Sequence, residues 1–218
     1  MAYLNAKKYD KRKFCDYYIY LIRIKNIFIF SFCPLKDYNS TIIKVSFFFL
    51  FFSIYYFINA LFFDEPTIHK IYEDEGLYNF IYLIPHILYS FIISHTLNTI
   101  IKYIFLSERD MYKIKIEKSL EKMYDRIDKV KKCLIIKYIC YFILSILFLL
   151  FFWYYLSSFG AVYQNTQIYL IKNTLISFGF SLFYPFIINI LPGMIRICSL
   201  KGNNNECLYK ISKFLHFI

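Results

Sequence analysis

The residue types that could do chemistry in this chain of 218 residues lie mostly inside apolar stretches. Two sets of polar residues recur at multiples of four positions, and this spacing places the members of each set along one face of a helix. The first set is His86, Ser90, Ser94 and Asn98, and the second is Asn173, Ser177, Ser181 and Asn189. We call these two sets the polar stripes.

The polar stripes have two interpretations. Polar side chains in lipid normally face protein or water, so the stripes could line a polar path through a channel or transporter subunit. Alternatively, small and polar residues bring two helices together through close contact and hydrogen bonds. We favour helix packing, because a cation path or proton relay generally includes an acid and neither stripe contains one.

Other candidates for metal binding or catalysis are few. His86 and His95 lie nine residues apart, on opposite faces of a helix, so they cannot share one metal ion. No two side chains show the pairing that nucleophilic or acid–base catalysis needs. The six cysteines lack the spacing of a zinc site. We therefore predict no catalytic residue, no metal site and no cofactor.

Five cysteines are expected near the membrane surface, where reversible palmitoylation is one fate and an unmodified thiol is the alternative that we favour. They are Cys15, Cys33, Cys133, Cys198 and Cys207.

Membrane-spanning helices must position these residues. The chain is 59% hydrophobic and 23% aromatic, and charge is nearly excluded from four long segments. About 20 apolar residues in a helix cover the roughly 30 Å of bilayer hydrocarbon. Backbone amides in lipid must also be paired internally, which requires helices here. The predicted spans are residues 42–63, 77–106, 133–159 and 168–191.

The distribution of lysine and arginine predicts how the spans are oriented, because these residues stay on the cytosolic side. Nine lie in residues 1–44, eleven lie from Lys102 to Lys137, and four follow from Arg196 onward. Only Lys70 and Lys172 remain for the other side. Both termini are therefore predicted to be cytosolic.

This orientation leaves two extracytosolic connections, an acidic loop at residues 64–76 and a short loop at residues 160–167. The acidic loop lacks the ligand spacing of a calcium loop, so we interpret it as a solvated segment.

Three segments are predicted on the cytosolic side. Residues 1–41 include an interfacial helix, since bases, tyrosines and aliphatic residues are mixed there without a clean span; a fifth, marginal span is the alternative that we do not favour. Residues 107–132 form a charged amphipathic helix, and residues 192–218 form a tail that begins where Pro192 and Gly193 end the fourth helix.

The charged helix carries apolar residues at heptad spacing, which we call the seam: Ile116, Leu120, Met123, Ile127 and Val130. The seam packs on its own chain or on the membrane surface in the interpretation that we favour, and it joins a second copy or a partner in the other.

Several phrases of the sequence resemble a multi-pass transmembrane module of protists with AT-rich genomes: "YDKRKFCDYY", "DYNSTIIK", "NALFFDEPTIHKIYEDEG", "NFIYLIPHILYS", "LFYPFIINILPGMIRICSL" and "NECLYKIS". The resemblance covers nearly the whole chain and brings no activity. It implies that the motif at Asp37 to Ser40 and the stretch from His69 to Gly76 are features of that module.

These observations predict an all-α membrane protein with four transmembrane helices, an N-terminal interfacial helix and a charged cytosolic helix between spans two and three. The predicted function is a non-enzymatic anchoring, scaffold or assembly module, and the alternative is a channel or transporter subunit. The predicted partners are the lipid bilayer and a second copy of the chain or other membrane proteins, with no nucleic acid. Which membrane holds the protein is not predicted.

Overall fold

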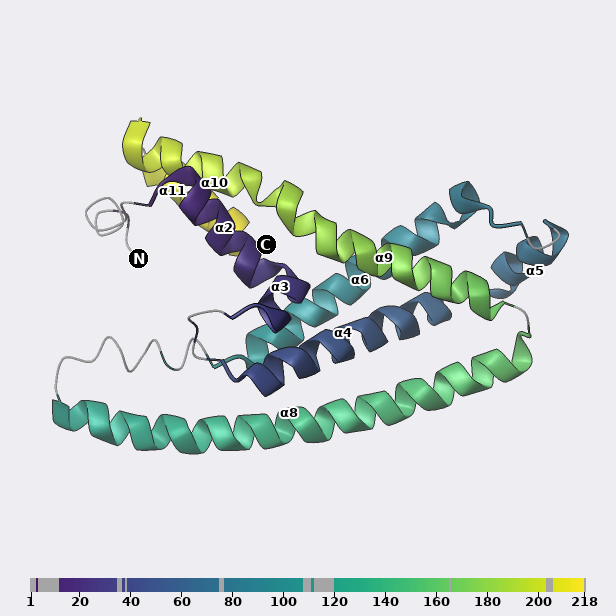
Figure 1. Ribbon diagram of the computed structural model, residues 1–218, viewed down its shortest axis with the longest axis horizontal. Helices are drawn as coiled ribbons and strands as arrows, with labels where there is room; N and C mark the ends of the chain where they lie inside the picture. Colours follow the sequence, from purple (N-terminus) through teal and green to yellow (C-terminus); the bar gives the residue numbers. More distant parts are fainter. Residues whose placement is uncertain are drawn as a thin grey trace. The chain divides into compact units, whose positions relative to one another are not determined.

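The computed structural model describes residues 3, 12–34, 37, 39–74, 77–107, 111, 120–164, 166–202 and 206–217. Throughout these residues all regular elements are helices, and the chain divides into two compact units (Figure 1). The first, which we call the large unit, is Lys36–Phe180. The second, which we call the terminal unit, combines Met1–Leu35 with Ser181–Ile218.

Four helical segments are long and apolar enough to cross a membrane. They are Thr41–Leu61, Phe80–Phe105, Arg126–Val162 and Gln167–Leu200. The predicted all-helical class and the predicted number of apolar spans are therefore confirmed, and four such helices are compatible with an integral membrane protein.

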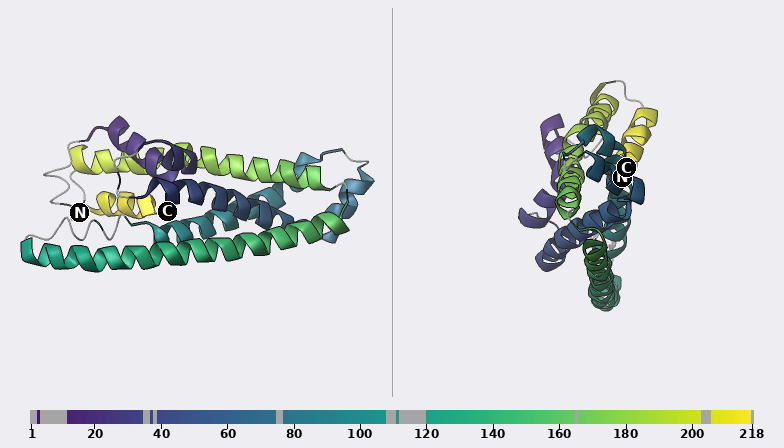
Figure 2. Two further views of the ribbon diagram at one scale, coloured as in Figure 1. Left: turned by 60° about the horizontal axis from the view of Figure 1, so that its bottom comes forward. Right: turned by 90° about the vertical axis from the view of Figure 1, so that its right-hand side faces the viewer.

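Helix α4 (Thr41–Leu61) is the centre of the large unit, and both α6 (Phe80–Phe105) and α8 (Leu120–Val162) pack on it (Figure 2). Aromatic rings fill these contacts: the ring of Phe57 in α4 stacks on that of Phe152 in α8, with 4.4 Å between centroids. The first half of α9 (Gln167–Ile188) also reaches α4, where Phe178 meets Phe48 edge-on. Half of the apolar stretch of α4 is buried, against 11% for α8.

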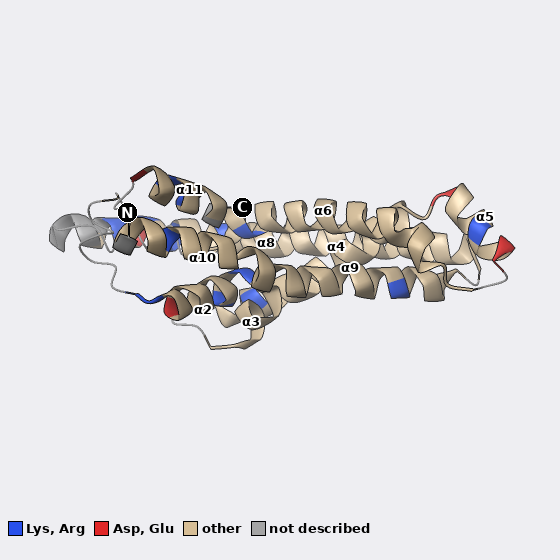
Figure 3. Cartoon of the chain, turned by 90° about the horizontal axis from the view of Figure 1, so that it is seen from above, with Lys and Arg blue, Asp and Glu red and all other residues tan. Residues whose placement is uncertain are grey.

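The acidic stretch folds as helix α5 (Glu65–Glu73), where we expected a solvated loop (Figure 3). Its two isoleucines, Ile68 and Ile71, are buried with Ala60, Phe159 and Leu170 at the ends of three other helices. The acids Glu65 and Glu73 are exposed. The loop interpretation missed this amphipathic cap because two apolar residues among many charges give only a weak periodic signal.

Helix α8 is uninterrupted over its 43 residues, so no break separates the charged segment after Leu120 from the apolar segment that follows. At 1.5 Å per residue the helix is about 65 Å long, roughly twice the thickness of bilayer hydrocarbon. Figure 2 shows its first turns extending past the ends of α4 and α6.

The fourth span is divided differently from our prediction. Helix α9 ends at Ile188, Asn189 forms a turn, and α10 (Ile190–Ile197) continues into a π-helix, η1 (Cys198–Gly202). Pro192 therefore does not end a helix. It lies in the first turn of α10, where a proline is tolerated because its missing N–H would have no partner there.

The terminal unit is built around α10, which contacts both α2 (Phe14–Lys25) and α11 (Glu206–Phe217). Asn26 separates α2 from α3 (Ile27–Phe32): its Oδ1 accepts from the backbone N–H of Ile29, and its Nδ2 donates to the Leu182 carbonyl at 2.7 Å. The N-terminal segment thus packs along the end of α9, while its placement at a membrane surface stays a prediction.

Candidate functional site

Asn59 links two helices inside the large unit and was not among the predicted site residues. It lies in α4 and is 2% exposed, and its Nδ2 donates to the Ser177 Oγ of α9 at 2.8 Å and to the Tyr55 carbonyl. Ser177 in turn donates to the Thr174 carbonyl. A single amide in an otherwise apolar span was the signal available in the sequence, because a polar group in lipid needs a partner.

Asn173 of the second stripe meets a residue that lies between α5 and α6. The hydroxyl of Tyr78 donates to the Asn173 Oδ1 at 2.5 Å. The neighbouring Lys172 ammonium lies over the rings of Tyr78 and Tyr169, 5.2 Å and 5.9 Å from their centroids. This cation–π contact retains the ammonium at one end of the large unit.

His86 of the first stripe contacts the cap helix. Its Nε2 is 3.4 Å from the hydroxyl of Thr67, a fully buried residue of α5. The backbone N–H of Thr67 donates to the Asp64 carboxylate, which caps α5. The hydrogen bonds from Thr67 hold the pKa of the Asp64 carboxyl below its usual range, and the nearby His86 acts in the same direction. His86 therefore belongs to a polar link between α5 and α6.

The rest of the first stripe lies in the face of α6 that is buried. Ser90 and Ser94 are fully buried and Asn98 is 5% exposed, together with Leu83 and Ile87 of the same face. Within the described part of the chain, their side-chain oxygens have no hydrogen-bond partner. Since α6 packs chiefly on α4, we infer that this row faces α4, where small side chains permit close approach.

The second stripe is divided between the two units. Asn173 and Ser177 belong to the large unit, and Ser181 and Asn189 to the terminal unit. Asn189 is fully buried and donates through its Nδ2 to the Pro185 carbonyl. In the large unit, Ser177 bonds to α4, and α6, which carries Ser90 and Ser94, packs chiefly on the same helix.

A second polar cluster joins the segment before α4 to the end of α6. The buried Lys44 ammonium pairs with the Asp37 carboxylate, which also accepts from the Asn39 amide. The Asn39 Oδ1 accepts from both the N–H and the hydroxyl of Ser107 at 3.0 Å. Lys137 of α8 donates to the Leu106 carbonyl at 3.0 Å. We call these residues the linker clamp.

The linker clamp contains two residues of the motif that the resemblance singled out, Asp37 and Asn39. Sequence spacing did not predict the clamp, because its partners lie up to 68 residues apart along the chain. Its chemistry is that of an ion pair and amide contacts that fix three chain segments together.

The seam lies only partly in the described side chains. Ile116 is outside the described residues, and the side chains of Leu120 and Met123 are likewise not described. Ile127 is 36% exposed and Val130 is half-buried. The role of the seam stays a prediction.

The cysteines and acids form no multidentate site in the described residues, where no group of three His, Cys, Asp or Glu side chains could hold a metal ion. All six cysteines are exposed. On α5, Lys70 pairs with Glu73 at 3.2 Å and with Asp74 at 3.3 Å. The described polar groups can therefore join helices and pair charges.

Comparison of the chain with protein-family models, with curated proteins and with solved structures gave no match.

Proposed function

We propose that this protein is a non-enzymatic, membrane-embedded assembly module that holds a charged helix rigidly outside the bilayer for association with a partner. The observation that carries the proposal is the continuity of α8. Its apolar part is the most hydropathic of the four spans and the least buried within the protein. Its charged part, Leu120 to Lys132, follows the same helix axis for about 20 Å.

A continuous helix has a mechanical advantage for assembly. A charged extension joined to its span by a flexible loop would lose conformational entropy on binding, whereas a rigid extension is already ordered. The extension also carries the seam residues Ile127 and Val130, which are not fully covered by the described part of the chain. A partner helix with complementary apolar spacing would bury them.

The charge distribution supports an orientation with both termini and the α8 extension in the cytosol. In this orientation α5 and the α8–α9 connection are extracytosolic, and Lys172 is held over two tyrosines near the outer interface.

Crosslinking in the native membrane tests the assembly role. In the variant Ile127→Gln/Val130→Gln we expect crosslinked complexes to diminish, because the apolar seam is lost. The matched control, Lys129→Gln/Lys132→Gln, introduces the same residue at the same spacing on another face and should leave the complexes unchanged. A purified wild-type chain that stays monomeric, with no reproducible crosslinked neighbour, would contradict the proposal.

A channel or transporter subunit is the second candidate, and the buried row of Ser90, Ser94 and Asn98 favours it. If this row conducts a solute, Ser94→Leu should abolish flux in reconstituted liposomes, and Asn98→Ala should alter its selectivity. If the row only packs helices, Ser94→Leu should instead overfill the α4–α6 contact and destabilise the fold by about 1–3 kcal/mol. Liposome flux measured beside thermal unfolding separates the two outcomes.

A further inference from the structure

Three lysines gather on α8 at the point where its apolar part begins. Lys129, Lys131 and Lys132 are all exposed, and from Lys129 to the end of the helix at Val162 the sequence contains no acid. Because a helix turns by about 100° per residue, Lys131 lies on the side of α8 roughly opposite to Lys129, with Lys132 between them. We call these three residues the lysine cluster.

The lysine cluster carries an excess of positive charge. The acid nearest to it in the sequence is Asp128, which is also exposed. One carboxylate beside three ammonium groups leaves this turn of the helix positive. The next lysine of α8, Lys137, is half-buried and donates to the Leu106 carbonyl at 3.0 Å, so it belongs to the linker clamp and not to the cluster.

The apolar side chains directly after the lysine cluster are largely uncovered by the described part of the chain. Ile135, Ile136 and Ile139 are 50%, 63% and 54% exposed. In a bilayer, acyl chains would cover these isoleucines. Lys132 precedes Ile136 by four residues, about 6 Å along the helix axis. The headgroups of the lipids that cover the isoleucines therefore lie at the level of the lysine cluster.

The direction of the lysine side chains suits contact with these headgroups. Side chains on a helix tilt toward its N-terminus, which on α8 is the charged end. The lysine stems therefore extend away from the apolar part, toward the headgroups and water. An ammonium is a compact point charge and does not require the planar, bidentate match that a guanidinium favours. The lysine cluster would accordingly select lipids by their charge.

We propose that the lysine cluster collects anionic phospholipids around α8 in preference to zwitterionic ones. Each lysine near an anionic bilayer surface favours binding by roughly fivefold. The proposal rests on the membrane placement given under the proposed function, but not on the assembly role. It adds a chemical class of lipid to the surroundings of the rigid extension.

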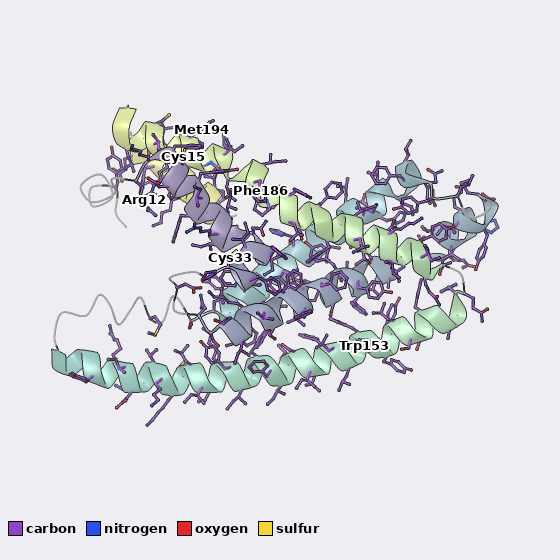
Figure 4. The ribbon with its side chains drawn as sticks, in the orientation of Figure 1. Arg12, Cys15, Cys33, Trp153, Phe186 and Met194 are labelled. Carbon is purple, nitrogen blue, oxygen red and sulfur yellow. The ribbon has the colours of Figure 1, made fainter. Side chains whose placement is uncertain are left out.

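Tryptophan fluorescence measures which lipids contact α8. Trp153 is the only tryptophan of the chain, is 69% exposed, and lies in the second half of α8, about 32 Å along the axis from Lys132 (Figure 4). The variant Trp153→Phe/Ile136→Trp instead places the single tryptophan beside the lysine cluster. Both proteins are reconstituted in phosphatidylcholine vesicles that contain brominated phosphatidylserine, whose bromines quench a tryptophan in contact with that lipid.

The quenching gives the preference for phosphatidylserine over phosphatidylcholine at each tryptophan. We expect a preference of at least fivefold in the Trp153→Phe/Ile136→Trp protein and a value near one at Trp153. Adding Lys131→Gln/Lys132→Gln to the Trp153→Phe/Ile136→Trp protein should lower its preference about fivefold, and high salt should lower it as well because the charges are screened. Lys131→Arg/Lys132→Arg is the matched control, which keeps the charge and should keep the preference.

An unchanged preference after Lys131→Gln/Lys132→Gln would overturn the proposal, and so would an equal preference at both tryptophans. These lysines are exposed, so their replacement should leave the fold intact. Quenching of Trp153 by brominated phosphatidylcholine tests separately whether α8 lies in lipid. Loss of that quenching would overturn the membrane placement and this proposal with it, whereas loss of crosslinked complexes alone would contradict only the assembly role.

Discussion

At the scale of single residues, buried polar groups join the helices of the large unit to one another. Asn59 joins α4 to α9, and Thr67 joins the cap helix to His86. The periodic spacing of the stripes made His86 predictable as a member of a polar face of α6, and Ser177 as a member of a polar face of α9. Asn59 and Thr67 could not be found by that criterion, because neither belongs to a series of polar residues at four-residue spacing and the partner of each lies elsewhere in the sequence.

The cap of α5 should depend on pH through Asp64. The folded-state pKa of this carboxyl is lowered, chiefly by the Thr67 hydrogen bonds. Its stabilising contribution is therefore complete above the unfolded pKa of about 3.9 and is lost as pH falls through the lower folded value. Asp64→Ala should cost about 1 kcal/mol in the stability of α5, and Asp64→Asn should keep the cap without its pH dependence.

Hydrogen exchange of the α5 amides, compared between variants at each pH, measures this effect. Equal protection of the wild-type and Asp64→Ala proteins at neutral pH would contradict it.

The Asp37–Lys44 pair should be costly to break from one side. The two side chains are 14% and 5% exposed, so Asp37→Ala leaves a buried ammonium without its carboxylate and should destabilise the fold by about 3 kcal/mol. The double variant Asp37→Leu/Lys44→Met should be destabilised less than Asp37→Ala, because it buries no unpaired charge. Unfolding in detergent micelles measures both. Glu73→Gln, which breaks an exposed pair, is the control. If Asp37→Ala lowers the free energy of unfolding by no more than Glu73→Gln does, this account is wrong.

At the scale of elements, the four apolar segments were predictable because apolar length is a local property of the sequence. Helix α5 was not predictable, because its two buried isoleucines lie among charged residues. The boundary that we drew after Lys132 follows a change in composition, and the structure shows that α8 continues through it without a break. The turn at Asn189 also escaped prediction, because Pro192 appeared to be the stronger signal and its position in the first turn of α10 depends on where α9 ends.

The continuity of α8 can be measured as a distance. Spin labels at Tyr124→Cys and Leu150→Cys, both exposed, should lie about 39 Å apart if the helix is unbroken over these 26 residues. The control pair, Ile136→Cys with Leu150→Cys, should lie about 21 Å apart. Both are made in a background without native cysteines. A hinge near Lys132 would shorten or broaden only the first distance.

At the scale of the whole molecule, two units form that the sequence did not separate. The terminal unit joins the first 35 residues to the last 38, and its contacts, such as Tyr18 with Phe186, link positions 168 residues apart. Local spacing carries no information on such pairings. The all-helical class followed from composition, whereas the grouping of the helices followed from their side-chain contacts.

The orientation in the membrane is the prediction that belongs to this scale. In a cysteine-free background, Tyr72→Cys on α5 should react with a membrane-impermeant maleimide added outside intact cells or sealed vesicles of native orientation. Tyr124→Cys on the α8 extension should react only after permeabilisation, because the lysine and arginine bias predicts a cytosolic location for it. Both residues are exposed, so access to the thiol is equal in other respects. The reverse labelling pattern would show that the topology is the opposite of the one predicted.

Because α8 is unbroken, the orientation of its apolar part determines the orientation of its charged part. Its apolar part, from Leu134 to Val162, is about 44 Å long, so in the proposed topology it exceeds the hydrocarbon thickness and would tilt to bury itself. A thinner bilayer would increase this tilt. Because α8 has no break, its charged end would tilt by the same angle and be displaced relative to the membrane surface.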